Sequence, residues 1–335
     1  MQNFEQLREL LSSPKRIVIT SHANPDGDAL GSSLGLYHYL ATKGHRLTVI
    51  MPTPMPSFLN WMPEYDKILV YDATMTISKQ IIEKAEIIFS LDYNSLSRID
   101  SMEGALRDAK GYKVMIDHHL DPDDFADAML SDTTASSACE LVYQFIDMLE
   151  DLDSLNAKAL DSIFVGLLTD TGGFRYATSP RLFRIVADML ERGVNNNVLT
   201  DLVFNSYTTK RFKLLGYCIY ECLELLKEAN TGLIVLTQAD YKRYNIQRGD
   251  LEGVVNFILR IRQIRCAAII TERRDIVKLS LRSKGDFSVQ AICSKYFNGG
   301  GHLNASGGAS RKSLRETVDL FKKVILEEYK EELTK

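Results

Sequence analysis

The sequence contains few cysteines, and none of them form a C-x-x-C pair. The 335 residues include five cysteines, an odd number, and no C-x-x-C motif occurs. A disulfide framework is typical of short chains with an even, dense set of cysteines, and this long chain has an odd and sparse one. The cysteine content therefore predicts reduced, mostly buried thiols of a cytosolic protein.

Long apolar runs are also missing. No uninterrupted apolar stretch approaches the roughly 20 residues that a membrane-spanning helix needs. Residues 1–11 show an amphipathic helical pattern with acidic residues, and this pattern lacks the apolar core of a signal peptide. We therefore expect a cytoplasmic protein with no membrane partner.

The sequence also lacks a strong net charge of either sign. The formal net charge is −4, which disfavours a protein coated in positive charge for gripping long duplex DNA. A local basic cleft for a short phosphate-bearing substrate stays compatible with this sum. The apolar fraction of 45% and the charged fraction of 25% are typical of a soluble globular protein. The length suggests about two domains.

The first half of the chain alternates short apolar segments with helical patterns. A helix is expected at 29–40, where leucines recur at helical spacing. This alternation predicts an α/β fold with a mostly parallel sheet flanked by helices. The other expected elements are strands at 16–20, 46–51, 67–71, 86–91 and 112–116, and helices at 138–149, 157–169, 181–192 and 210–227.

A turn-rich break, E-A-N-T-G, occurs at residues 228–232. It predicts two domains, 1–229 and 230–335, of which the second is a smaller mixed α/β domain. The elements expected in the second domain are strands at 233–237, 267–271 and 277–282, and helices at 252–259, 289–296 and 314–332.

The strongest signal is an acidic segment that directly follows the first expected strand. It reads S-H-A-N-P-D-G-D-A-L-G over residues 21–31 and contains His22, Asp26 and Asp28. In an open α/β sheet, ligands bind at the carboxyl ends of the strands. A surface turn in which Asp28 caps the following helix is the alternative that this segment alone leaves open.

Three further segments end in the same kind of polar cluster. They are the strand 86–91 followed by Asp92, the strand 112–116 followed by Asp117, His118 and His119, and the apolar run 162–168 followed by T-D-T-G-G with Asp170. Taken alone, each cluster could be a local cap or a polar surface. Because parallel strands present their carboxyl ends along one edge of a sheet, we expect these clusters to converge.

Four carboxylates that meet in a partly dry cleft repel one another strongly. Two divalent cations bring four positive charges and balance them. Carboxylate ligands with a minority of imidazole suit Mn²⁺ or Mg²⁺ rather than structural zinc. The sequence therefore predicts a two-metal site, with the expected ligands His22, Asp26, Asp28, Asp92, His118 and Asp170.

In order along the chain, these four motifs resemble those of the DHH phosphoesterase superfamily, and the D-H-H triplet at 117–119 is the most specific of them. The resemblance implies two ions, usually Mn²⁺, that share Asp92 as a bridge. It implies that His119 contacts the substrate phosphate or the leaving group, and that Asp117 orients a neighbouring histidine. The implied ligand sets are His22, Asp26 and Asp92 for one ion, and Asp28, Asp92, His118 and Asp170 for the other.

A glycine-rich element, N-G-G-G-H-L-N-A-S-G-G, occupies residues 298–308. Successive glycines let backbone N–H groups approach an anion, so Gly299, Gly300 and Gly301 are candidate substrate-binding residues. The element is not a Walker loop, because the G-K-[ST] ending is absent. A flexible linker is the alternative.

The sequence around this element is basic. Arg262 and Arg282 stand out because each lies within an otherwise structured segment, and a bidentate arginine is suited to phosphate. The glycine run and the segment S-L-R-S at 280–283 resemble the DHH-associated domain. That resemblance implies that Arg282 and His302 hold the substrate.

The two resemblances together imply an oligoribonuclease that cuts short RNA from an end and also removes phosphate from phosphoadenosine phosphate. They further imply a short single-stranded RNA or small nucleotide as substrate, and a homodimer as a possible assembly. Two related activities stay open, an inorganic pyrophosphatase or exopolyphosphatase and a cyclic-dinucleotide phosphodiesterase. A non-catalytic nucleotide-binding module would lack a metal ligand, and no ligand is missing here.

Overall fold

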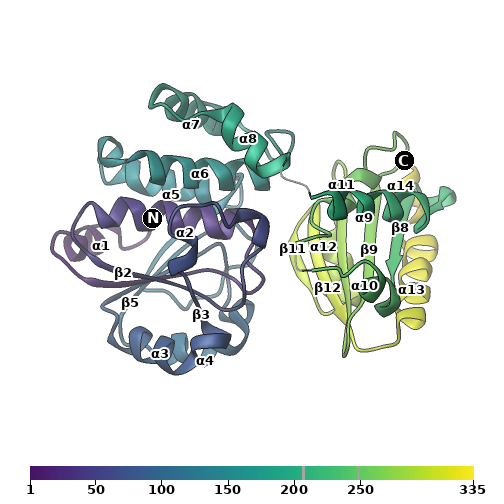
Figure 1. Ribbon diagram of the computed structural model, residues 1–335, viewed down its shortest axis with the longest axis horizontal. Helices are drawn as coiled ribbons and strands as arrows, with labels where there is room; N and C mark the ends of the chain where they lie inside the picture. The colour runs from purple at the N-terminus through teal and green to yellow at the C-terminus, as the bar shows by residue number, and fades with distance from the viewer. Residues whose placement is uncertain (206–207, 248) are drawn as a thin grey trace. The chain divides into compact units, whose positions relative to one another are not determined.

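The computed structural model describes residues 1–205, 208–247 and 249–335. The chain divides into two compact units, Met1–Ser206 and Tyr207–Lys335 (Figure 1). Each unit has a six-stranded sheet of its own. Both units combine strands with covering helices, which confirms the predicted α/β class.

The sheet of the first unit is parallel throughout, with the strand order β3-β2-β1-β4-β5-β6. Its core strands are near-continuous apolar runs, as expected for strands that helices cover on both faces. In β4, Phe89 packs into the core on one face and Ile88 into the core on the other. The strands are β1 Arg16–Thr20, β2 Arg46–Met51, β3 Leu69–Val70, β4 Ile87–Leu91, β5 Tyr112–Asp117 and β6 Ala128–Ser131.

Helices α2, α5 and α6 cover one face of this sheet, α3 and α4 cover the other, and α7 and α8 lie beyond α6 (Figure 1). The helices are α1 Phe4–Leu11, α2 Gly27–Ala41, α3 Tyr71–Lys84, α4 Glu103–Asp108, α5 Ala138–Met148, α6 Ala157–Asp170, α7 Pro180–Glu191 and α8 Asn196–Phe204. Short 3₁₀ segments are η1 Ser57–Leu59, η2 Tyr65–Lys67, η3 Leu96–Met102 and η4 Leu152–Ser154.

The strand order reverses between β1 and β4. From β1 the chain proceeds outward to β2 and β3, then returns to place β4 on the other side of β1. Such a switch point opens a crevice at the carboxyl ends of its two strands, because the following loops run in opposite directions. The acidic segments after β1 and β4 therefore lie at the position in this sheet that is best suited to a ligand.

Helices α2 and α6 pack unusually closely through glycines of α2. A Cβ atom at Gly31 would lie 2.6 Å from the carbonyl oxygen of Ser162, and one at Gly27 would lie 2.4 Å from Oγ1 of Thr169. Only glycine allows the backbones to approach this far. Because Gly27 opens α2 and Thr169 lies near the end of α6, this packing brings the start of α2 beside the end of α6.

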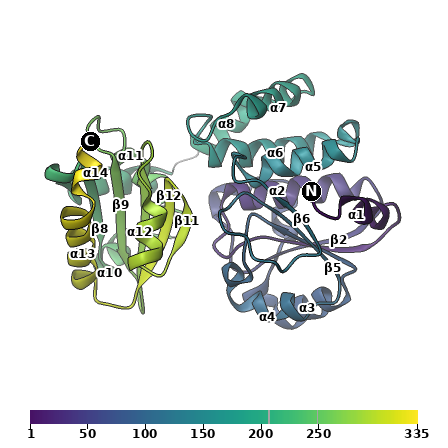
Figure 2. The ribbon, with the colours of Figure 1, turned by 180° about the vertical axis from the view of Figure 1, so that it is seen from behind.

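The second unit contains a mixed sheet with the order β11-β12-β10-β9-β8-β7. Helices α12 and α13 pack on one face, and α9 and α11 pack on the other (Figures 1 and 2). The strands are β7 Leu223–Leu226, β8 Thr231–Leu236, β9 Cys266–Glu272, β10 Val277–Ser283, β11 Gly300–His302 and β12 Ala305–Ser310. The helices are α9 Thr209–Tyr220, α10 Gln238–Arg243, α11 Val254–Ile258, α12 Val289–Tyr296, α13 Leu314–Lys323 and α14 Lys330–Thr334, with a 3₁₀ turn Lys227–Ala229 and a π-helical turn Val324–Glu328.

The units divide earlier in the chain than the sequence pattern indicated. A single helix was expected at 210–227 in the first domain, but α9 ends at Tyr220 and β7 follows it. Strand β7 pairs with β8 in antiparallel register, and Leu214 of α9 packs with Ile234 of β8. Both elements therefore belong to the second unit.

All five cysteines are free, and four of them are buried. Within the described ranges, no helix is both long enough and apolar enough to cross a membrane.

Candidate metal centre

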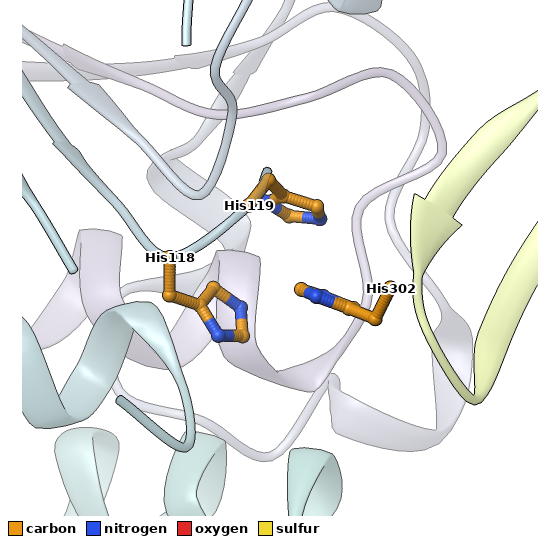
Figure 3. A group of neighbouring side chains, drawn as sticks. All are labelled: His118, His119 and His302. Atoms are coloured by element: carbon orange, nitrogen blue, oxygen red, sulfur yellow. The ribbon is translucent and has the colours of Figure 1, made fainter. Parts of the chain in front are cut away.

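Most of the predicted ligands lie at the carboxyl ends of β1, β4 and β5. His22 follows β1, and Asp92 directly follows β4. His118 and His119 come immediately after β5, with their ring centroids 5.0 Å apart (Figure 3). The sheet therefore brings together residues that are far apart in the sequence.

Asp170 reaches the same place by a different route. The run 162–168 was grouped with the strand ends in the argument for convergence, yet it lies within the helix expected at 157–169, and Asp170 is the last residue of that helix, α6. The close packing of α6 against α2 brings this helix end to the centre, where Oδ2 of Asp170 lies 3.6 Å from Nε2 of His118. The expected convergence therefore holds, although the fourth member comes from a helix.

The donor atoms form two groups that share Asp92. In one group, Nε2 of His22 lies 3.3 Å from Oδ2 of Asp92 and 3.9 Å from Oδ2 of Asp26. In the other, Nε2 of His118 lies 3.5 Å from Oδ1 of Asp92 and 3.7 Å from Oδ2 of Asp28. One ligand atom from each member of either group lies within 4.8 Å of the others, which is close enough for a single metal ion.

The backbone around Asp92 positions its carboxylate between the two groups. Asp92 has φ +62°, a left-handed conformation that aspartate and asparagine tolerate better than most residues. Its amide donates a hydrogen bond to the carbonyl of Ile116 on β5, 3.0 Å away. The side chain is almost fully buried. Asp92 is therefore held in place by the neighbouring strand.

Asp28 is held by backbone amides at the start of α5. The amide of Ala138 donates to its Oδ2 at 2.6 Å, and the amide of Cys139 donates to its Oδ1 at 2.9 Å. Gly166 of α6 leaves room for this carboxylate, because a Cβ atom there would lie 2.9 Å from Oδ1 of Asp28. Sequence analysis did not identify these amides. Ser137, which caps α5, marks the helix start that provides them.

Asp26 uses its two oxygens differently. Its Oδ1 accepts hydrogen bonds from the amides of Asp28 and Ala29, each 3.0 Å away, and so caps α2. The sequence had suggested Asp28 as the capping residue. The other oxygen, Oδ2, faces His22. One carboxylate therefore anchors the helix and contributes to the donor group.

The buried acids of the centre strongly perturb one another. Burial and the charges of Asp92 and Asp170 raise the pKa of Asp28 well above its usual value. Burial also acts to raise the pKa of Asp92, but hydrogen bonds with His118 and His22 outweigh it and hold this pKa well below its usual range. Burial would lower the pKa of His118, yet the hydrogen bond with Asp92 and the surrounding carboxylates raise it to about 10. Without cations, protons therefore offset part of the negative charge.

Asp117 fixes the orientation of His119. Its Oδ1 lies 2.7 Å from Nδ1 of His119, and its Oδ2 accepts a hydrogen bond from the amide of His119 at 2.9 Å. Asp117 is fully buried at the end of β5. Burial lowers the pKa of His119, while Asp117 opposes that effect. The imidazole is therefore held with Nδ1 directed to Asp117.

In the second unit, two predicted substrate-binding residues share one face of the sheet. Arg282 of β10 lies opposite Ala305 of β12, which in turn lies opposite His302 of β11. Directly opposite residues in antiparallel strands point to the same face. Leu281 of β10 packs into the core beneath α12 and α13, so Arg282 points to the other face. The small side chain of Ala305 thus separates the arginine from the histidine.

The predicted glycine element forms the end strands of this sheet. A Cβ atom at Gly299 would lie 1.9 Å from the carbonyl oxygen of Gly307, and one at Gly301 would lie 2.6 Å from that of Ala305. Gly301 also has φ +140°. Backbone packing therefore requires glycine at these two positions, whereas a Cβ atom at Gly300 would meet no described atom within 4 Å.

Arg262 is not grouped with these residues. It lies exposed in the turn between α11 and β9. Its predicted role in substrate binding stays a prediction.

Comparison with known proteins agrees with this arrangement. The model of the DHH family, N-terminal domain, matches residues 16–167, and the model of the DHHA1 domain matches residues 230–331. The bifunctional oligoribonuclease and PAP phosphatase NrnA of Thermus thermophilus is 31% identical, over 95% of this chain and 90% of that protein. The chain therefore belongs to the DHH family and carries a DHHA1 domain.

Solved structures place the chain among related folds. An exopolyphosphatase-related protein from Bacteroides fragilis is 37% identical with a TM-score of 0.93, over 99% of this chain and 97% of that one. RecJ from Thermus thermophilus, solved in complex with Mn²⁺, shares the fold with a TM-score of 0.55 and 13% identity, over 99% of this chain and 55% of that one.

Proposed function

We propose that this protein is a two-metal phosphoesterase that hydrolyses short oligoribonucleotides from an end and removes phosphate from phosphoadenosine phosphate. The observation that carries the proposal is the meeting of four carboxylates and two imidazoles around the buried Asp92. The identity shared with NrnA of Thermus thermophilus supports the choice of substrate. One unit holds the acidic centre and the other holds Arg282 and His302. This combination suits a substrate that carries several phosphates.

The donor set fits two divalent cations. His22, Asp26 and Asp92 would hold one ion, and four carboxylates in total would balance the charge of both. The second ion would be held by Asp28, Asp92, His118 and Asp170. Oxygen-rich ligands with a minority of imidazole favour Mn²⁺, with Mg²⁺ as the alternative. When bound, such ions polarise a phosphate and lower the pKa of a nearby water.

We assign His119 a direct role at the substrate. Its Nδ1 faces Asp117, so the imidazole can present Nε2 to a phosphoryl or leaving oxygen. In the imidazolium form, a hydrogen bond donated by Nε2 would stabilise the negative charge that develops there during hydrolysis. The buried carboxylate of Asp117 keeps the ring in this orientation and supports the imidazolium form, which carries a proton on both nitrogens.

We assign binding of the rest of the substrate to the second unit. Arg282 can donate two parallel hydrogen bonds to a phosphate, and His302 lies on the same face. The backbone of Gly299, Gly300 and Gly301 would approach the same anion. Arg262, on its exposed turn, would contact a phosphate further along a short strand. Binding of the substrate by Arg282 and His302 would fix the orientation of the scissile bond.

A substrate panel with Mn²⁺ tests this proposal. The panel comprises short RNA, phosphoadenosine phosphate, linear and cyclic di-AMP, and pyrophosphate. We expect short RNA and phosphoadenosine phosphate to be turned over faster than the other substrates. Fastest release of phosphate from pyrophosphate would instead indicate a pyrophosphatase, and fastest turnover of cyclic di-AMP would indicate a cyclic-dinucleotide phosphodiesterase. Chelation of the metal should abolish each activity, which excludes a metal-independent contaminant.

A further inference from the structure

Arg98 lies beside the candidate metal centre on η3, the segment that follows Asp92. Its carbonyl accepts a hydrogen bond from the amide of Ala23, 2.7 Å away. The carbonyl of Ala23, in turn, lies 2.9 Å from Nδ1 of His22. The loops after β1 and β4 are thereby joined, and Arg98 is held next to a predicted metal ligand through its backbone.

The positive charge of Arg98 acts on both imidazoles of the adjacent loops. Burial lowers the pKa of His119, and the positive charge of Arg98 lowers it further. Burial and Arg98 act in the same direction on His22, where the hydrogen bond and charge of Asp92 outweigh them. One side chain therefore lies within electrostatic reach of both imidazoles. A permanent positive charge therefore lies near the centre, on the segment that follows Asp92.

The charge of Arg98 is not used within the protein. Among residues 1–205, 208–247 and 249–335, no carboxylate forms an ion pair with Arg98, although four carboxylates lie in the adjacent centre. Two other arginines of this unit are paired, Arg181 with Glu140 and Arg192 with Asp188. Once cations balance the carboxylates, Arg98 is surplus positive charge in a half-buried position. Such a charge is suited to an anionic ligand.

We propose that Arg98 binds the phosphate that is cleaved, donating hydrogen bonds to its non-bridging oxygens. This inference rests on the proposed function, because it assigns Arg98 to the substrate of that site. A terminal phosphate, as in phosphoadenosine phosphate, carries more charge and more acceptor oxygens than an internal diester. Phosphoadenosine phosphate should therefore depend on Arg98 more strongly than a dinucleotide does.

A substitution at this position separates substrate binding from folding. The bond to Ala23 uses the carbonyl of Arg98, so Arg98→Ala and Arg98→Lys both retain it. Arg107→Ala is the matched control, because Arg107 is exposed on the adjacent helix α4 and pairs with Glu103. The measurements are kcat and KM for both substrates, the affinity of the Mn²⁺-loaded protein for inorganic phosphate by calorimetry, and the affinity for Mn²⁺ itself.

For Arg98→Ala we expect kcat/KM for phosphoadenosine phosphate to fall by about 100-fold. The phosphate affinity of Arg98→Ala should fall as well, while its Mn²⁺ affinity stays at the wild-type value. The Arg107→Ala variant should match the wild type in all of these measurements. Arg98→Lys should recover part of the loss, because it keeps the charge but not the two parallel donors.

Wild-type phosphate affinity and kcat/KM in Arg98→Ala would overturn the inference. A loss of Mn²⁺ affinity that accounts for the loss of activity would also overturn it, because Arg98 would then only position His22. If the wild-type protein hydrolysed nothing in the panel, yet bound phosphate through Arg98, the proposed function would fail, and only the assignment of Arg98 to phosphate binding would stand.

Discussion

Replacement of Asp92 by asparagine should lower kcat by at least about 1,000-fold. Asp92 is common to both donor groups, with one oxygen toward His22 and the other toward His118. The amide of asparagine cannot provide two anionic oxygens, so both proposed cation sites should be weakened together. Asparagine is the appropriate replacement because Asp92 has φ +62°, a conformation that would strain alanine.

The measurement is kcat for phosphoadenosine phosphate in Mn²⁺, together with circular dichroism and thermal unfolding in chelator. We expect Asp92→Asn to stay folded without metal, since the change removes a negative charge that repels Asp28. Asp151→Asn is the matched control, because its carboxylate pairs with Lys43 on another part of the unit. Wild-type activity of Asp92→Asn would rule out the shared ligand.

Replacement of His119 by glutamine should lower kcat by about 100-fold while both cations remain bound. His119 is outside the two donor groups assigned to metal, and its ring is aligned by Asp117. The loss should therefore appear in the chemical step, with little change in KM.

The kcat of His119→Gln is measured with saturating Mn²⁺, and the bound metal is counted by elemental analysis. His45→Gln serves as the control, because His45 is also buried but precedes β2, at the opposite edge of the sheet. Loss of one Mn²⁺ per chain in His119→Gln would show that this histidine is a ligand. The assignment to the substrate phosphate would then be wrong.

Much of the first unit could be predicted because its signals are local. Strands β1 and β2 have the predicted bounds, since β-branched apolar runs between turn residues mark buried parallel strands. The position of the site followed from the same pattern, because three of the acidic clusters are at strand ends. Strand order cannot be read in this way. The switch point between β1 and β4 became visible only in the structure.

The contributions that sequence analysis missed depend on contacts between distant segments. The run before Asp170 was expected within a helix at 157–169, as the structure has it, but periodicity does not show where the end of that helix packs. Only its packing against the glycines of α2 brings Asp170 to the centre. The amides of Ala138 and Cys139 that hold Asp28 likewise come from about 110 residues away.

The second unit shows the same limit in its secondary structure. Residues 223–226 read L-E-L-L, which continues the apolar spacing of α9 but equally suits a strand. These residues form strand β7 and not a continuation of α9, because they pair with β8. The glycine run was predicted to approach an anion. Its role in the fold, the close pairing of β11 with β12, depends on a partner strand that periodicity does not reveal.

The most direct test is anomalous diffraction at the manganese edge from crystals of the wild-type protein grown with Mn²⁺. Two peaks per chain are predicted, one next to His22 and Asp26 and the other next to His118 and Asp170, with a carboxylate oxygen of Asp92 coordinated to each. Peaks elsewhere, or an Asp92 side chain that contacts neither ion, would contradict a shared two-metal centre.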